Sequence, residues 1–183
     1  MGEPVLICWS GGKDSSLALQ AALKDPSLDV LALVTTVTSG YDRISMHGVR
    51  CSLLRRQAES IGLPLEQVEI PIRASNEIYQ ERMRRLLERY KRIGVRRVIF
   101  GDLFLEEIRS YQQENLAKIG MEGLYPLWLK DTGKLAREFI AGGFKAVLPF
   151  LDSFRTWLAL PPWEQEPALR PLFYPEDAPA LRS

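Results

Sequence analysis

The residues best suited to chemistry form one stretch near the start of the chain, Ser10-Gly11-Gly12-Lys13-Asp14-Ser15-Ser16. Residues 4–9 before it are an apolar run typical of a buried strand, and a helix with apolar residues at helical spacing follows from residue 15. A strand, a glycine turn and a helix N-terminus together direct backbone N–H groups at an anion. The glycines allow close approach of the backbone, and the lysine adds a positive charge. The stretch therefore predicts a nucleotide-phosphate site.

Asp14 indicates what accompanies the phosphate. A carboxylate about 4 Å from a phosphate charge costs on the order of 4 kcal/mol at an effective dielectric of about 20. A helix dipole returns only about 0.3–1 kcal/mol. A cation must therefore lie between the two groups, and Mg²⁺ is the divalent ion that suits carboxylate and phosphate oxygens. The alternative is a tight turn, capped by serine and aspartate, that binds no ligand.

Alternating strands and helices position this loop. Further strands are expected at residues 29–37, 64–70, 97–102, 124–127 and 145–151, and helices at 15–23, 49–61, 76–93, 106–119 and 132–141. Such alternation predicts right-handed βαβ units, and so an α/β fold whose mostly parallel sheet has helices on both faces. Ligands of such sheets bind beyond the carboxyl ends of the strands, near the point where the strand order reverses.

Two other segments bring polar residues to that edge of the sheet. Thr35 and Thr36 end the second strand, and we expect the adenosine of ATP against them. Gly101 and Asp102 end the fourth strand, and we expect Asp102 to face the phosphates or the metal; it could instead cap the next helix. The candidate catalytic residues are thus Lys13, Asp14 and Asp102, and the two aspartates are the candidate metal ligands.

The only histidine of the chain, His47, lies in a short loop after the second strand, and Arg50 follows it. A lone histidine is more often structural or exposed than functional. Here it lies next to glycine and close to an arginine, which is suited to bidentate binding of anions. Both residues are candidates for contacting a polyphosphate or a substrate carboxylate.

Composition limits the class of protein. The chain has 183 residues, 46% of them hydrophobic, and a net charge of +1, which gives no electrostatic case for a nucleic-acid partner. No apolar run approaches the roughly 20 residues of a membrane span, and the N-terminus lacks a signal-peptide pattern, so we expect a cytoplasmic protein. Residues 1–152 form the expected ATP-binding domain. Residues 153–183 hold half of the twelve prolines and are expected to pack on that domain as an extension.

The Ser-Gly-Gly-Lys-Asp-Ser motif is not a Walker A loop. It resembles the PP-loop of the N-type ATP pyrophosphatases, which cleave ATP between its α and β phosphates. Over residues 4–152 the chain also resembles the diphthine–ammonia ligase family. That resemblance rests on Met46-His47-Gly48, Phe100-Gly101-Asp102-Leu103-Phe104-Leu105-Glu106, Arg109, Pro126-Leu127-Trp128 and Gly142-Gly143-Phe144-Lys145-Ala146-Val147.

The resemblance implies a three-layer αβα fold of the adenine nucleotide alpha hydrolase type, with five strands in the order 3-2-1-4-5. It implies an ATP-dependent amide ligase that adenylates a small-molecule or protein-borne carboxylate, releases pyrophosphate, and lets ammonia displace AMP. Asp14 and Asp102 would hold Mg²⁺, and a homodimer is one possible assembly. The candidates for the second substrate's pocket are His47, Arg50, Glu106 and Arg109.

Three features keep other functions open. The acidic Gly-Glu-x-Gly-Glu-Phe motif of the family does not follow Asp152, so the acyl substrate is not specified. An RNA-thiolating enzyme of the same superfamily would need a reactive cysteine, and this chain has Cys8 and Cys51. A nucleotide sensor without catalysis would need the loop alone.

Overall fold

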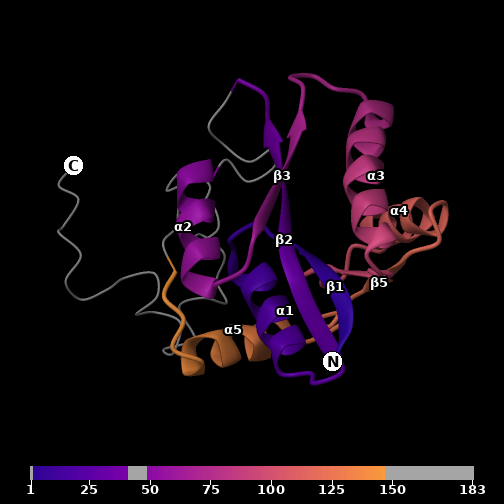
Figure 1. Ribbon diagram of the computed structural model, residues 1–183. Helices are drawn as coiled ribbons and strands as arrows, with labels where there is room; N and C mark the ends of the chain where they lie inside the picture. Colours follow the sequence, from indigo (N-terminus) through magenta and orange to yellow (C-terminus); the bar gives the residue numbers. More distant parts are fainter. Residues whose placement is uncertain (1, 41–48, 147–183) are drawn as a thin grey trace. The chain divides into compact units, whose positions relative to one another are not determined.

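A computed structural model of the protein describes residues 2–40 and 49–146. A five-stranded sheet in the order β3-β2-β1-β4-β5, with every neighbouring pair parallel, forms the centre of the fold (Figure 1). Its strands are β1 (Glu3–Cys8), β2 (Leu28–Thr38), β3 (Leu65–Ile70), β4 (Arg97–Ile99) and β5 (Glu122–Leu124). The expected fold class and strand order are confirmed.

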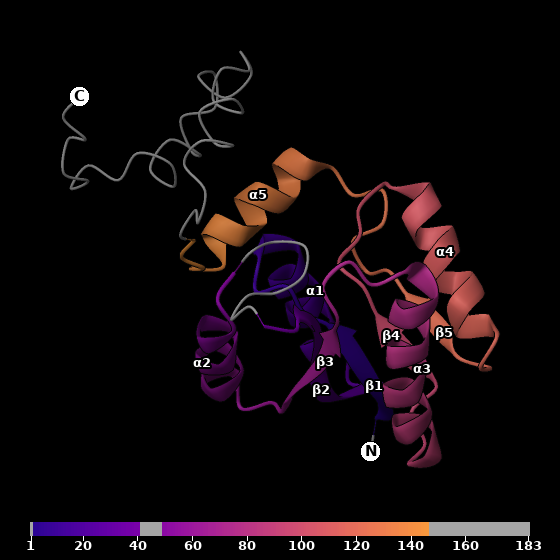
Figure 2. The ribbon, with the colours of Figure 1, turned by 90° about the horizontal axis from the view of Figure 1, so that it is seen from above.

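Helices cover both faces of this sheet. They are α1 (Lys13–Leu23), α2 (Cys51–Ile61), α3 (Asn76–Arg92) and α4 (Glu106–Ala117). Figure 2 shows α1 and α2 on one side of the strands and α3 and α4 together on the other. Right-handed crossovers require this arrangement, because the chain moves from β1 toward β3 in one direction and then returns past β1 to β4 and β5. The strand order therefore reverses between β1 and β4.

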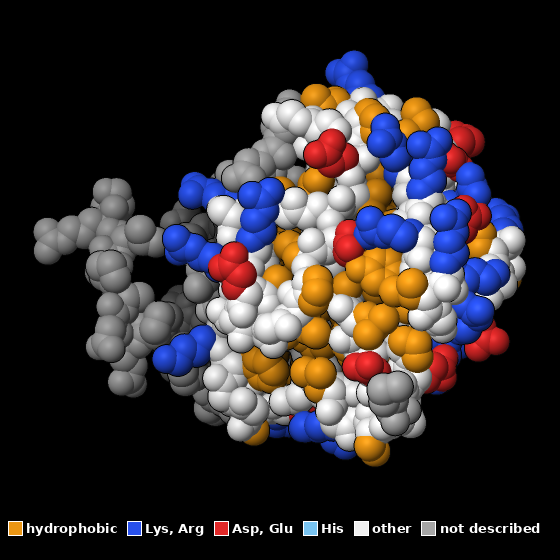
Figure 3. Space-filling model, in the orientation of Figure 1, with side chains coloured by type: hydrophobic (Ala, Val, Ile, Leu, Met, Phe, Trp, Pro, Cys, Tyr) orange, Lys and Arg blue, Asp and Glu red, His pale blue; other side chains and the backbone are white. Residues whose placement is uncertain are grey.

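The central strand β1 is the most deeply buried element. Val5, Leu6 and Ile7 are fully buried, as expected for a parallel strand covered on both faces. On the side of α3 and α4, strand residues such as Val34 and Val98 pack with helix residues such as Leu87 in one apolar cluster. In Figure 3 apolar side chains gather beside α3, while Lys and Arg side chains follow its outer side.

The structure corrects some element boundaries. The strand expected at residues 124–127 is instead β5, two residues earlier, and a turn follows it. Pro126 has no N–H for a strand ladder, and the Tyr125 ring stacks on Phe100 with centroids 5.4 Å apart. The strand expected at 97–102 ends at Ile99. The sequence alone predicts Asn76 as the N-cap of the helix at 76–93, whereas the structure has Ser75 as the N-cap of α3 and Asn76 as its first helical residue.

The sheet and α1–α4 form one compact unit that ends at Leu129, and a second unit begins at Lys130. That second unit contains α5 (Thr132–Ala141), where the Asp131 side chain caps the helix by accepting from the Lys134 N–H at 2.6 Å. The expected boundary at residue 152, the proline-rich extension and residues 147–151 of the expected last strand lie outside the described residues. Among the described helices, none has the length and apolarity that a membrane crossing requires.

Candidate functional site

The turn between β1 and α1 lies at the carboxyl edge of the sheet. Gly11 has φ +73°, and a Cβ there would lie 2.4 Å from Oε1 of Gln57 and 2.5 Å from Cδ2 of Leu54. Gly12 is the N-cap of α1, and its carbonyl oxygen accepts from the Ser16 N–H at 3.1 Å and the Ser16 hydroxyl at 2.8 Å. The first N–H groups of a helix have no partner within the helix. The turn therefore presents donors at the start of α1.

Lys13 and Asp14 open the first turn of α1. The Lys13 ammonium forms an ion pair with Oδ1 of Asp14, and both side chains are partly exposed. Because the two side chains are paired only with each other among the described residues, each can exchange its partner for a ligand that carries the partner's sign of charge. The lysine would then contact a phosphate, and the carboxylate would contact a cation.

The loop after β4 packs directly against this first turn. A Cβ at Gly101 would lie 3.0 Å from the carbonyl carbon of Asp14 and 3.1 Å from the backbone nitrogen of Ser15. Only a glycine fits that approach without moving the backbone. The neighbouring Asp102 accepts from Nε2 of Gln112 at 3.1 Å through its Oδ2. Asp14 and Asp102 thus come from adjacent loops at the point where the strand order reverses.

A cavity of about 790 Å³ opens beside these loops. Both aspartates line it, and the other expected nucleotide-binding residues in its wall are Ser10, Ser15, Thr35, Thr36 and Gly101. The remaining loop residues, Gly11, Gly12, Lys13 and Ser16, do not line it. The structure therefore gathers the ends of β1, β2 and β4 around one space, which is the standard ligand position in open parallel sheets.

Of the four residues expected to bind a second substrate, the three that the structure describes do not line this cavity. Arg50 is the exposed N-cap of α2, and Glu106 is the exposed first residue of α4. The Arg109 guanidinium lies over the rings of Tyr125, at 5.2 Å, and Trp128, at 4.5 Å. Its buried Nε has no hydrogen-bond partner among the described residues. His47 lies outside the described residues.

Two glutamines that support the site were not foreseen. Nε2 of Gln57 on α2 donates to the Gly11 carbonyl oxygen at 3.2 Å, and Gln112 on α4 holds Asp102. Each occupies the inward face of its helix: Gln57 is three residues after buried Leu54, and Gln112 is four residues before buried Leu116. The signal in the sequence is a glutamine among the apolar residues of a buried helix face, because a buried amide needs hydrogen-bond partners elsewhere in the structure.

The donor set fits a metal that is shared with phosphate. Among the described residues, no group of three or more His, Cys, Asp or Glu side chains could hold a metal ion. Asp14 and Asp102 supply two carboxylates to one cavity. Mg²⁺ is usually held by one or two carboxylates together with substrate phosphates and water. The pair therefore suits a magnesium ion that arrives with a nucleotide.

The cysteines do not provide a nucleophile. Desolvation, with a smaller effect from the charge of Asp102, raises the pKa of the Cys8 thiol to about 12. The reactive form of cysteine is the thiolate, so Cys8 is inert at neutral pH in this state. Cys51 is buried. These environments do not favour an enzyme that transfers sulfur through a cysteine.

Comparisons with known proteins give one family. Residues 3–123 match the family described as "Diphthamide synthase N-terminal domain". No curated protein matches the sequence. A crystal structure of a protein from the universal stress protein family from Burkholderia pseudomallei is similar over 67% of this chain and 94% of that chain, with 17% identity and a TM-score of 0.37. Since the family match covers well over half of the chain and both site aspartates, the chain belongs to the diphthamide synthase N-terminal domain family of PP-loop ATP pyrophosphatases.

Proposed function

We propose that the protein is an ATP-dependent amide ligase that adenylates a carboxylate and transfers the acyl group to ammonia. The observation that carries the proposal is the meeting of Asp14 and Asp102, from the loops after β1 and β4, in one cavity beside the N-terminus of α1. A loop for binding phosphate alone needs no second carboxylate. Two carboxylates beside N–H groups that can donate to a phosphate suit a site that holds a metal-bound nucleotide for reaction.

In the first step a carboxylate oxygen of the substrate attacks the α-phosphorus of ATP. A bond forms between that oxygen and phosphorus, and the bond from the α-phosphorus to the oxygen that bridges to the β-phosphate breaks. Pyrophosphate leaves with the electron pair. Lys13 and the N–H groups at the start of α1 would stabilise the charge that develops on it. The product is an acyl-adenylate, which has the good leaving group that a carboxylate lacks.

In the second step the nitrogen of ammonia attacks the acyl carbon. The carbon–nitrogen bond forms, the bond from the acyl carbon to the AMP oxygen breaks, and AMP leaves with the electron pair. The nitrogen gives its extra proton to solvent. Holding the two reactants side by side in the cavity supplies much of the rate advantage, because it makes the encounter intramolecular.

Asp14 and Asp102 would hold the magnesium ion. When bound, such an ion neutralises phosphate charge and polarises the phosphoryl oxygens. In the ion pair the charges of Lys13 and Asp14 balance each other, and nucleotide binding would separate the two side chains. Gln112 would keep Asp102 oriented toward the cavity through its 3.1 Å hydrogen bond.

Product analysis tests the proposal. The protein is incubated with magnesium, ammonium and a panel of carboxylic acids, with ATP labelled either at the α or at the γ phosphate. We expect label from the α position in AMP and label from the γ position in pyrophosphate. Asp14→Asn should abolish both products. Asp29→Asn is the matched control, because Asp29 is exposed near the start of β2, at the opposite edge of the sheet, and it should leave turnover unchanged.

Three results would contradict the proposal or a part of it. Formation of ADP and inorganic phosphate would show cleavage of the outer anhydride. Tight binding of ATP without any AMP, across the whole panel of acids, would indicate a nucleotide sensor instead. Full activity of the Asp14→Asn variant would remove the assigned role of that carboxylate in metal binding.

A further inference from the structure

The peptide unit that joins Gly11 to Gly12 has more conformational freedom than its neighbours in the turn between β1 and α1. Glycine has no Cβ and occupies positive and negative φ about equally well, so a peptide unit between two glycines can rotate by half a turn at little cost. Such a rotation exchanges the directions of the Gly11 carbonyl and the Gly12 N–H. The Gly12 N–H is one of the donors at the start of α1, so its direction affects whether the turn can bind a phosphate.

Helix α1 fixes the next peptide unit of the turn but not this one. The Gly12 carbonyl oxygen accepts from the Ser16 N–H at 3.1 Å, from the Ser16 hydroxyl at 2.8 Å and from the Ser15 hydroxyl at 3.1 Å. Among the described residues, no backbone N–H donates to the Gly11 carbonyl oxygen. Its partner is Nε2 of Gln57 on α2, at 3.2 Å. The orientation of the peptide unit between the glycines therefore depends on a side chain from another helix.

The bond from Gln57 directs the Gly12 N–H away from α2. The peptide bond is trans, so the Gly11 carbonyl and the Gly12 N–H point in opposite directions. With the carbonyl held on the side of α2, the N–H lies on the side of Ser10 and donates to its Oγ at 3.4 Å. Ser10 lines the same cavity as the two site aspartates. A 3.4 Å bond is longer than the usual range of roughly 2.7–3.2 Å, so a phosphate oxygen can replace it readily.

The surroundings of Gln57 do not favour a glutamine for stability alone. Gln57 is half-buried on the inward face of α2, where Leu54 and Ala58 are buried. Its Oε1 is buried without a hydrogen-bond partner among the described residues. Such an acceptor destabilises the folded state, whereas an apolar side chain of the same length would leave no unpaired atom there. A polar residue that lowers stability and makes one bond to a ligand-binding loop is typical of a functional position.

We propose that Gln57 is a positioning residue for the polyphosphate of ATP: it holds the peptide unit between Gly11 and Gly12 with the N–H directed at the β- and γ-phosphates. This inference rests on the proposed function, which places those phosphates at the start of α1, and adds the group that keeps the turn in its binding orientation. Gln57 does not line the cavity, so its effect passes through the backbone of the turn. Loss of one neutral hydrogen bond shifts an equilibrium by roughly 2- to 13-fold.

Titration calorimetry of the whole chain with α,β-methylene ATP and with AMP, both with magnesium, tests this role. AMP lacks the β- and γ-phosphates and is the internal reference. Gln57→Met keeps the length of the side chain and removes the donor. We expect its affinity for the ATP analogue to fall about five-fold or more, with the affinity for AMP unchanged. The urea midpoint should stay the same or rise, because the unpaired Oε1 is removed as well.

A second variant and a control accompany Gln57→Met. Gln57→Glu keeps the shape of the side chain but presents only oxygens to the Gly11 carbonyl at neutral pH, so its loss of affinity for the ATP analogue should be at least as large. Gln67→Met is the control. Gln67 on β3 is also half-buried and also has one buried amide atom, Nε2, without a partner among the described residues, but its Oε1 accepts from Arg55 at 3.1 Å. This variant should bind both nucleotides as the unmodified protein does.

The outcomes separate this inference from the proposed function. If the unmodified protein does not bind the ATP analogue, the proposed function and the inference both fail. If Gln57→Met binds the analogue as the unmodified protein does, or loses affinity for AMP to the same degree, the positioning role is overturned while the proposed function stands. An equal loss in Gln67→Met would also overturn the role, because the effect would then not depend on the bond to Gly11.

Discussion

Gly11 is the loop residue with the least room for a side chain. Its φ of +73° is costly for any L-residue. An added Cβ would lie 2.4 Å from Oε1 of Gln57 and 2.5 Å from Cδ2 of Leu54, which is closer than non-bonded atoms approach. We expect Gly11→Ala to lower the free energy of unfolding by at least the roughly 1–2 kcal/mol of a left-handed residue. It should also weaken ATP binding, on the order of ten-fold, because it displaces the loop.

Gly62 provides the matched control for that substitution. It has nearly the same φ, +80°, but an added Cβ would meet nothing within 4 Å. Gly62→Ala should therefore carry the backbone cost alone and leave ATP affinity unchanged. Urea denaturation and titration with a fluorescent ATP analogue measure the two quantities. Equal ATP affinities for the two variants would contradict the role of the Gly11 turn in phosphate binding.

Gln112 supports the site through a hydrogen bond to Asp102. Gln112→Leu removes that bond but keeps the shape of the side chain similar, so we expect turnover to fall about 10–100-fold, the usual effect of losing a group that orients a metal ligand. The affinity for ATP without magnesium should change little. The steady-state rate and the magnesium concentration for half-maximal activity are the measurements.

The neighbouring residue Gln113 is exposed on the same helix and serves as the control. Gln113→Leu alters the same side-chain type at nearly the same position in α4, without contacting Asp102. Its turnover should match that of the unmodified protein. A rate loss of similar size in both variants would mean that α4 is disturbed as a whole and that the bond to Asp102 has no separate role.

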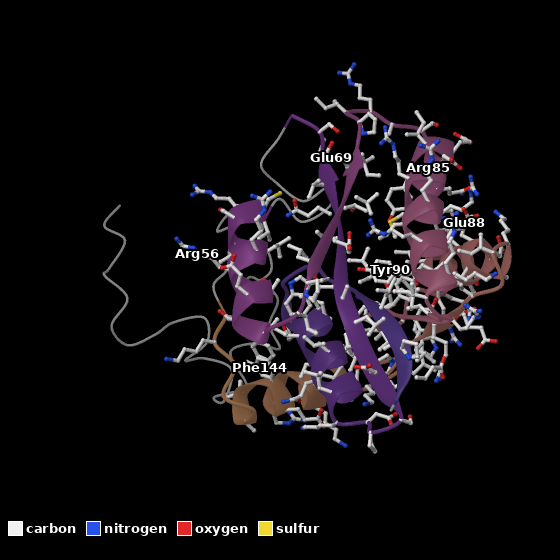
Figure 4. All side chains as sticks on the ribbon, viewed as in Figure 1. Arg56, Glu69, Arg85, Glu88, Tyr90 and Phe144 are labelled. Atoms are coloured by element: carbon white, nitrogen blue, oxygen red, sulfur yellow. The ribbon has the colours of Figure 1, made fainter. Side chains whose placement is uncertain are left out.

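At the scale of elements, Glu66 links β3 to α3. Its carboxylate accepts from the Tyr90 hydroxyl at 2.7 Å and pairs with Arg89 at 2.6 Å. In Figure 4 the side chain of Tyr90 lies between α3 and the strands, in contrast to Arg85 and Glu88. Burial raises the pKa of Glu66, but the hydrogen bonds from Tyr90 and Arg89 outweigh it and hold the pKa below the usual value of 4.5.

That lowered pKa makes the contribution of Glu66 depend on pH in a defined direction. Because the folded state binds the proton more weakly than the unfolded state, the stabilisation is complete above about pH 4.5 and is lost as the pH falls through the lower folded pKa. We expect Glu66→Gln to lower the free energy of unfolding by about 1.5–2 kcal/mol at pH 7, the lower part of the range for hydrogen bonds to a charged group. The cost should shrink as the pH falls below about 4.5 and through the lower folded pKa, as measured by urea denaturation across the acid range.

Glu69→Gln is the control on the same strand. Glu69 is exposed and lies at the far end of β3 from Glu66 (Figure 4). A substitution there should change the free energy of unfolding by less than about 0.5 kcal/mol at either pH. If the Glu66→Gln difference stayed constant from pH 7 to pH 3, the link between β3 and α3 would not be electrostatic.

At the scale of the whole molecule, the α/β fold class and the phosphate loop could be foreseen because both depend on local patterns, whereas the strand order was expected only from the resemblance to a known family. Apolar runs alternating with helical periodicity predict βαβ units, and the Ser-Gly-Gly-Lys-Asp-Ser motif places its own turn. The close packing of Gly101 on Asp14 follows from the same rules, since parallel strands bring their carboxyl ends together.

The supporting residues could not be foreseen in the same way. The bond from Gln57 to Gly11 joins positions 46 residues apart, and no local pattern specifies that pairing. Arg109 was expected at a substrate pocket from the family resemblance, and the structure places its guanidinium over the rings of Tyr125 and Trp128, a contact that no local pattern specifies. The part of the cavity that lies between α3 and α4 depends on the spacing of these helices above the sheet, which only tertiary packing determines.

The central claim is that the turn of residues 10–16 holds the triphosphate of ATP with a magnesium ion between Asp14 and Asp102. A crystal structure with magnesium and the α,β-methylene analogue of ATP, whose inner anhydride position resists cleavage, tests it most directly. We predict the triphosphate against the N-terminus of α1, with both aspartates contacting the ion or its water. A nucleotide bound elsewhere on the molecule, with these residues unchanged, would contradict the account.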